Sequence, residues 1–133
     1  MLRTQLTPRP RYDEPERELF YAAIAQLGAF LVEHGVPVII DATANRRAYR
    51  ERVRERTARF AEVFVDTAAQ VCEARDPKGL YRLAREGRSA TLPGLQAAYE
   101  APERPDLVVR GDAGTPEQAA SRIRSLLEQR GWA

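Results

Sequence analysis

Cysteine, histidine, methionine and tryptophan each occur once in the 133 residues, and long hydrophobic runs are missing. The single cysteine, Cys72, cannot form an internal disulfide and gives no cysteine cluster for a metal. The longest apolar stretches are broken by charges or glycine, so we expect neither a membrane-spanning segment nor a signal peptide. These absences favour a cytoplasmic protein with no membrane partner.

The charge of the chain is nearly balanced. Twenty-one Lys and Arg face 19 Asp and Glu, which leaves a net charge of +2 and a pI of about 9.0. This balance does not by itself indicate nucleic-acid binding. The 44% hydrophobic and 30% charged content is typical of a soluble globular protein, and the length suits one domain.

Helical and strand-like segments alternate along the chain. Asp13 can cap a helix whose apolar residues recur at helical spacing up to Gly35. Continuous apolar runs predict strands that are buried on both faces. Besides the helix at 13–35, we expect an irregular arm at 1–11, strands at 36–40, 60–65 and 107–109, helices at 45–59, 67–75 and from Thr115 onward, and a loop or lid at 88–98. This alternation predicts a parallel α/β sheet.

Two aspartates end predicted strands. Asp41 follows residues 36–40 and Asp66 follows a buried run, at the carboxyl ends where open α/β sheets bind ligands. Each could instead cap the following helix. For Asp66, which precedes Thr67, we predict a cap; for Asp41, in the string DATAN, we predict a functional role.

The predicted helix at 45–59 is rich in arginine, with Glu51 and Glu55 interleaved. Most of these arginines should form a solvated, partly paired surface. An alternative is that Arg46, Arg47 and Arg50 attract a phosphate or sulfate near the strand end. Nucleic-acid binding through this helix is a third interpretation, which the interleaved acids disfavour.

Two strings are far more specific than these patterns. Residues 63–81, VFVDTAAQVCEARDPKGLY, and residues 98–102, AYEAP, resemble adenylyl-sulfate kinases, the P-loop kinases that phosphorylate the ribose of adenylyl sulfate. The resemblance implies a three-layer α/β/α sandwich with a parallel sheet. It also implies one partial domain over residues 1–133, with a lid at about 76–102.

The resemblance assigns roles residue by residue. Arg75 and Lys78 match the Arg-Asp-x-Lys-Gly-Leu-Tyr lid segment, which implies contact with ATP. Arg3 and Arg17 match acceptor-side positions. Tyr99 matches the motif after the lid and is a candidate to bind the acceptor, with a packing role in the lid as an equal alternative. The DATAN string is similar to P-loop kinases in which the strand-end aspartate, here Asp41, assists Mg²⁺. Nucleotides are thus the implied small-molecule partners, and because family members are often dimers, a homodimer is an open expectation.

The chain departs from the family pattern. No G-x-x-x-x-G-K-[ST] occurs, so the backbone nest, lysine and hydroxyl that hold the phosphates and Mg²⁺ are missing from these 133 residues. The Leu-Asp-Gly-Asp segment with the family's base is missing too, and residues 90–94 read ATLPG where the family has Lys-Asn-Phe-Thr-Gly. We therefore expect the isolated chain to be inactive. The alternative is a non-catalytic module that binds a nucleotide or another anionic ligand.

The missing phosphate-loop strand has a structural consequence. In the family it lies between the strands that correspond to residues 36–40 and 60–65. Without it, either these two strands pair directly or the chain is a fragment of a longer kinase.

Overall fold

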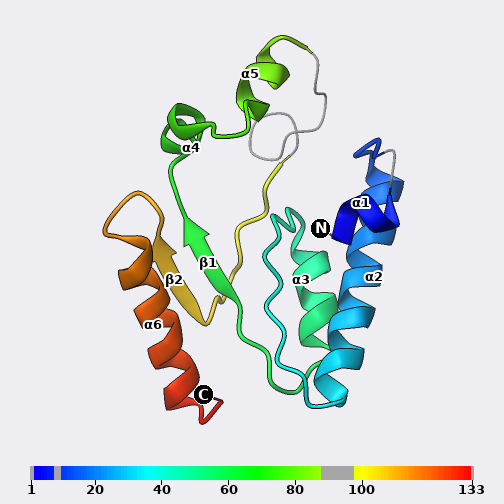
Figure 1. Cartoon of the computed structure of the whole chain (residues 1–133), viewed down its shortest axis with the longest axis vertical. Coiled ribbons are helices and arrows are strands. Elements are labelled where there is room, and N and C mark those ends of the chain that lie inside the picture. The colour runs from blue at the N-terminus through cyan, green and yellow to red at the C-terminus, as the bar shows by residue number, and fades with distance from the viewer. Residues whose placement is uncertain (1, 8–9, 88–97, 133) are drawn as a thin grey trace. The chain divides into compact units, whose positions relative to one another are not determined.

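The computed structural model describes residues 2–7, 10–87 and 98–132. The chain forms two compact units, one of Met1–Phe60 with Ala90–Glu100 and one of Ala61–Ser89 with Ala101–Ala133. Figure 1 shows the elements of both. Among the described helices, none combines the length and apolar character needed to cross a bilayer.

The first unit consists of three helices, α1 (Leu2–Leu6), α2 (Glu14–Glu33) and α3 (Arg47–Arg54). The Asp13 side chain caps α2 by accepting a hydrogen bond from Glu16 N over 3.0 Å. The helix gives way to Gly35, whose φ of +79° suits glycine. Helix α2 therefore begins and ends as its sequence predicts. Helix α1 corrects the prediction of an irregular arm, and α3 is shorter than the predicted 45–59.

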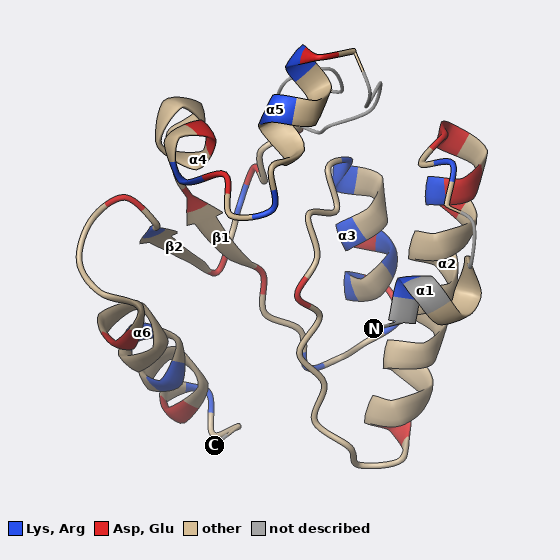
Figure 2. Ribbon diagram, turned by 45° about the horizontal axis from the view of Figure 1, so that its top comes forward, with Lys and Arg blue, Asp and Glu red and all other residues tan. Residues whose placement is uncertain are grey.

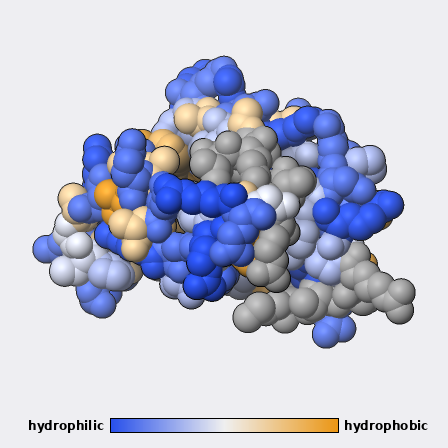
Figure 3. Space-filling model, turned by 90° about the horizontal axis from the view of Figure 1, so that it is seen from above, coloured by the Kyte–Doolittle hydropathy of each residue, from blue (hydrophilic) through white to orange (hydrophobic). Residues whose placement is uncertain are grey.

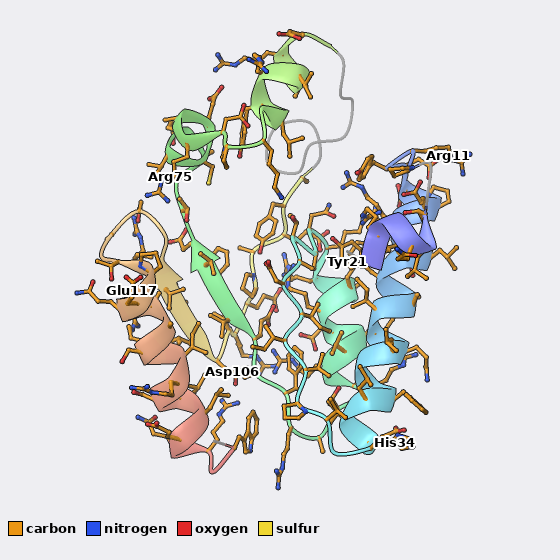
Figure 4. All side chains as sticks on the ribbon, viewed as in Figure 1. Arg11, Tyr21, His34, Arg75, Asp106 and Glu117 are labelled. Carbon is orange, nitrogen blue, oxygen red and sulfur yellow. The ribbon has the colours of Figure 1, made fainter. Side chains whose placement is uncertain are left out.

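Helices α2 and α3 lie side by side and share a small aromatic core (Figure 1). Tyr21 extends from α2 and stacks on Tyr49 of α3 with 4.4 Å between ring centroids (Figure 4). Phe20 meets Tyr21 edge to face at 5.6 Å. The apolar face predicted for α2 is only partly right, because Leu19 and Leu27 are 70% and 43% exposed.

The strand predicted at residues 36–40 is wrong. These residues are irregular, and Ile39 is 95% exposed. An apolar run becomes a strand only where a neighbouring backbone takes its N–H and C=O groups.

The second unit contains β1 (Val63–Asp66), α4 (Ala69–Arg75), α5 (Leu80–Arg85), β2 (Leu107–Arg110) and α6 (Pro116–Gln129). Strands β1 and β2 pair in parallel, with Val63 opposite Leu107 and Asp66 opposite Arg110. Helix α6 packs beside β2 (Figure 1). The predicted start of α6 is confirmed: Thr115 and Gln118 form a reciprocal capping box, and Pro116 opens the helix.

Charged groups are spread over most described elements, and the arginines of α3 are conspicuous (Figure 2). Within α3, Arg52 pairs with Glu18 and Arg54 with Glu51 at 3.3 Å, and Arg46 at the N-cap position pairs with Glu14 at 2.5 Å. The view in Figure 3 shows a mainly hydrophilic surface with smaller hydrophobic patches. The predicted pairing of arginines with acids is confirmed for these three residues.

Candidate functional site

Asn45 connects the stretch before α3 to residues 98–100. Its Nδ2 donates a hydrogen bond to the Ala98 carbonyl over 3.0 Å, and its own carbonyl accepts from Glu100 N over 2.8 Å. Asn45 is only 7% exposed, so these bonds satisfy its own side-chain amide and main-chain carbonyl, which have little access to water. Tyr99 is thereby fixed beside the N-terminus of α3.

Helix α3 obtains its N-terminal cap from a distant residue. Arg46 occupies the N-cap position without a capping side-chain bond, while Glu100 Oε2 accepts from Arg47 N over 2.7 Å. A carboxylate at a helix N-terminus is also favoured by the helix dipole. Residues 98–100 and α3 therefore stabilise one another.

Arg50 completes this connection. Its guanidinium donates to the carbonyls of Ala44 and Glu100, the latter over 2.6 Å. Its Cζ lies 5.7 Å from the Tyr99 ring centroid, within the range of a cation–π contact. Glu14 raises the pKa of Arg46, first through a hydrogen bond and then through its charge. Protein groups thus engage the side chains of Arg46 and Arg50, which were both considered for anion binding.

Two residues next to these groups have unusual backbone conformations. Ala44 has φ +38° and Tyr12 has φ +59°, values that L-residues rarely adopt. The Tyr21 hydroxyl accepts from Ala44 N over 3.0 Å, and the Tyr12 carbonyl accepts from Arg17 Nε over 2.9 Å. Strained backbone of this kind is concentrated at functional sites.

The two predicted acceptor-side arginines differ in their surroundings. Arg17 reaches toward Asn45, with a long Nη1–Oδ1 contact of 3.5 Å. Arg3 pairs with Glu16 at 3.2 Å, and its Cζ lies 3.7 Å from the Phe20 ring centroid. The structure therefore brings Arg17 and Tyr99 to one cluster around Asn45, whereas the contacts of Arg3 stabilise the start of α2.

Asp41 is exposed in the irregular stretch between α2 and α3. No group of three or more His, Cys, Asp or Glu within the described ranges is arranged to hold a metal ion. One exposed carboxylate suits a Mg²⁺ ion that takes its other ligands from nucleotide phosphates and water. Among the described residues, Asp41 could therefore supply one carboxylate to such an ion, and nucleotide and water would have to supply its other ligands.

The predicted ATP-binding residues lie in the second unit. Arg75 is the last residue of α4 and donates to the Gly111 carbonyl over 2.7 Å (Figure 4). Lys78 is exposed in the turn between α4 and α5. Asp76 binds the N–H groups of Tyr81 and Arg82, each over 3.2 Å, so it supports the start of α5. Gly79 adopts a left-handed φ of +64° in this turn, which explains the need for glycine.

The carboxyl ends of β1 and β2 carry a charged cluster. Arg110 binds both carboxylate oxygens of Asp112, over 2.9 and 2.8 Å, and lies 3.8 Å from Asp66. The hydrogen bond from Arg110 is the main reason why the pKa of Asp112 is lowered. Asp66 is the last residue of β1, and the N-cap of α4 is Ala68. The predicted capping role of Asp66 is therefore wrong, because α4 begins two residues further on.

An open groove of about 520 Å³ lies between β2 and α6. None of the predicted site residues lines it. The lining residues are Asp106, Leu107, Gln118, Ser121, Arg122, Ser125, Leu126 and Gln129.

Sequence reasoning missed the roles of Asn45, Arg50 and Glu100 in this cluster. All three act through contacts with residues far away in the chain, which periodicity cannot reveal. One local signal was available: Asn45 is a polar residue that follows an apolar run and precedes a helix with no capping side chain of its own.

Comparison with known proteins places these observations in a family. Residues 1–110 match the family described as adenylylsulphate kinase. An adenylyl-sulfate kinase of Microcystis aeruginosa is 34% identical over 132 residues, which cover 99% of this chain and 73% of that protein. A bifunctional enzyme CysN/CysC of Xylella fastidiosa is 43% identical over 106 residues, 78% of this chain but 17% of that protein.

A solved structure agrees with the sequence relatives. The Mycobacterium tuberculosis APS kinase CysC, in complex with AMPPNP and APS, superposes with a TM-score of 0.86 and 33% identity. The match covers 96% of this chain and 75% of the mycobacterial one. The α/β fold with a parallel sheet, predicted from the sequence, is thus confirmed as P-loop kinase-like. The chain belongs to the adenylyl-sulfate kinase family.

Proposed function

We propose that the chain forms the acceptor-binding and lid portion of a kinase that transfers the γ-phosphoryl group of ATP to adenylyl sulfate in sulfate assimilation. Family membership supports the reaction, and the cluster of Arg17, Asn45 and Tyr99 is the observation in this structure that carries the acceptor assignment. In the reaction the 3′-hydroxyl oxygen bonds to the γ-phosphorus, the bond from that phosphorus to the bridging oxygen breaks, and ADP and the hydroxyl proton leave.

The first unit supplies the acceptor side of the proposal. Arg17 suits the negative charge of the phosphate–sulfate group, since guanidinium and oxyanion form strong charge-assisted hydrogen bonds. Tyr99 is 38% exposed, which leaves ring surface that could contact the nucleoside. Arg3 remains a proposed acceptor residue, although it would have to share its charge with Glu16.

The second unit supplies the nucleotide side. Arg75 and Lys78 are proposed to hold ATP phosphates or adenine, and both are exposed to an incoming ligand. Asp41, in the first unit, is proposed to help hold Mg²⁺, which when bound shields the charge of the phosphates.

We expect this chain to bind adenylyl sulfate without phosphorylating it. Phosphoryl transfer depends on backbone N–H groups and a lysine around the phosphates, and the 133 residues contain no phosphate-loop motif. We expect calorimetry to detect adenylyl sulfate binding, while a coupled assay detects no ATP-dependent phosphorylation. Turnover by the purified chain would refute the requirement for the loop. Absence of adenylyl sulfate binding would refute the acceptor assignment.

A non-catalytic module is the second candidate function. It is favoured by the ATLPG string at residues 90–94, which replaces the lysine and phenylalanine of the family's lid. A kinase portion should lose adenylyl sulfate affinity when Arg17 is replaced by Gln. An equally strong response to unrelated anions such as inorganic sulfate, insensitive to Arg17→Gln, would favour the module.

We also propose a cytoplasmic homodimer. Leu19, Leu27 and Phe30 lie along one side of α2 and are 70%, 43% and 51% exposed, an apolar strip that a second copy could cover. Sedimentation equilibrium should show a dimer that Leu19→Lys shifts toward monomer. A monomer at high protein concentration would contradict this.

A further inference from the structure

Asn45 is a buried polar residue that contacts three other residues of the candidate site. A buried amide is costly unless its donor and acceptor are both used. Asn45 uses its Nδ2 on Ala98, its main-chain carbonyl on Glu100 and its Oδ1 on Arg17. The residue thus connects the two groups that the proposed function places against the acceptor.

Asn45 forms hydrogen bonds with the residues that precede and follow Tyr99 in the chain. Ala98 and Glu100 are its immediate neighbours, and Asn45 binds the carbonyl of the first and the N–H of the second. Fixing the peptide groups on both sides of a residue restricts the direction of its side chain. Arg50 adds a third restraint, since it binds the Glu100 carbonyl and lies near the Tyr99 ring.

Only an amide side chain fits these partners. A carboxylate in place of the amide would keep the oxygen near Arg17 but set a negative charge against the Ala98 carbonyl. An alanine would leave that carbonyl without its side-chain donor. Asn45, at 7% exposure, has little surface left for a ligand, so its influence must pass through Arg17 and Tyr99.

We propose that Asn45 is a positioning residue that sets the affinity for adenylyl sulfate by holding Tyr99 and Arg17 in one arrangement. The inference rests on the proposed function and adds a residue that the family resemblance does not assign. Asn45 acts at the binding step. It restricts the side chains of Arg17 and Tyr99 before the acceptor binds, so binding costs less conformational entropy.

Calorimetry with adenylyl sulfate tests the proposal on the 133-residue chain. We expect Asn45→Ala and Asn45→Asp to weaken binding about tenfold, the scale of one buried hydrogen bond left unmade. Gln26→Ala, which removes an exposed amide from α2 in the same unit, is the matched control and should bind like the native chain.

A double-mutant cycle separates positioning from general loss of structure. If Asn45 acts through Tyr99, Asn45→Ala should cost much less affinity in a Tyr99→Ala background than in the native one. Equal losses in both backgrounds would overturn the proposal, as would native affinity in Asn45→Ala.

Hydrogen exchange gives a readout that needs no ligand. Asn45→Ala should accelerate exchange at Glu100 N–H more than at amides of the α2 core, such as Ala25. If the native chain fails to bind adenylyl sulfate, the proposed function falls and with it the affinity role of Asn45. The exchange rates then still decide whether Asn45 orders residues 98–100: unchanged exchange at Glu100 would show that it does not.

Discussion

At the residue scale, Gly111 shows how one missing side chain allows the end of β2 to approach β1. A Cβ built at Gly111 would lie 2.0 Å from Thr67 Oγ1 and 3.3 Å from Val65 Cγ1. Contacts below 3 Å cannot persist, so the strand end or Thr67 would have to move. The Gly111 carbonyl also accepts the hydrogen bond from Arg75, a proposed ATP-binding residue. The close approach of β2 to β1 at Gly111 is thus connected to the proposed nucleotide site.

We therefore predict that Gly111→Ala lowers the free energy of unfolding by about 1–3 kcal/mol, the usual range for overpacking. Gly28→Ala is the matched comparison. A Cβ there meets only Ile40 Cδ1 at 3.4 Å, and alanine favours the helix, so a gain of about 0.5–1 kcal/mol is expected. Urea unfolding of both variants measures the difference. A stabilising Gly111→Ala would contradict this account.

Some site residues can be identified from a local sequence motif, and others only from contacts with distant residues. Arg17, Arg75 and Tyr99 could be found because they lie in strings that resemble a family. Asn45 and Glu100 could not be assigned their roles, because a cap taken from a residue 53 positions away leaves no trace in periodicity. The predicted cap at Asp66 failed for a related reason: Asp, Thr and Ala stand in sequence before α4, and sequence alone does not say where the turn begins.

At the element scale, helices with their own caps were the most predictable parts of the fold. Asp13 before α2 and Thr115 before α6 act within three residues of the helix start, so the sequence contains the whole interaction. Residues 36–40 were less predictable, because a strand forms only where a neighbouring strand binds its backbone N–H and C=O groups. The short α1 was missed because it carries no recognisable cap.

Helix α5 provides a pH-dependent prediction. Partial burial opposes ionisation of Asp76, but hydrogen bonds from the N–H groups of Arg82, Tyr81 and Leu80 together outweigh it and lower the pKa of the carboxyl. A carboxyl whose pKa is lower in the folded state stabilises that state above its unfolded pKa of about 3.9, and this stabilisation is lost as the pH falls further.

Protection of the Tyr81 and Arg82 amides should therefore decrease as the pH is lowered below about 4. NMR hydrogen exchange, corrected for intrinsic rates, measures this. Asp76→Ala should remove both the protection and its pH dependence. Glu86→Ala, which alters an acid at the other end of α5, should retain them; pH-independent protection in the native chain would be incompatible with this role of Asp76.

At the scale of the whole molecule, the described residues contain little fully buried apolar volume. The aromatic core is formed by Phe20, Tyr21 and Tyr49, and no large side chain among the described residues is less than 2% exposed. Ile39 and Val65 are 95% and 59% exposed, although apolar runs of this kind are normally covered. The family signature predicted the fold class, but which apolar residues stay uncovered depends on neighbours that a sequence pattern does not specify.

The isolated chain should consequently bind the dye ANS under native conditions, as proteins with exposed apolar surface do. Ile39→Lys should reduce ANS fluorescence and change the free energy of unfolding by no more than about 0.5 kcal/mol, because an exposed side chain loses few contacts. Tyr49→Ala, at 3% exposure in the core, should cost about 3–5 kcal/mol and increase dye binding. A chain that binds no ANS, or that loses as much stability with Ile39→Lys as with Tyr49→Ala, would show that residues 36–40 are covered in solution.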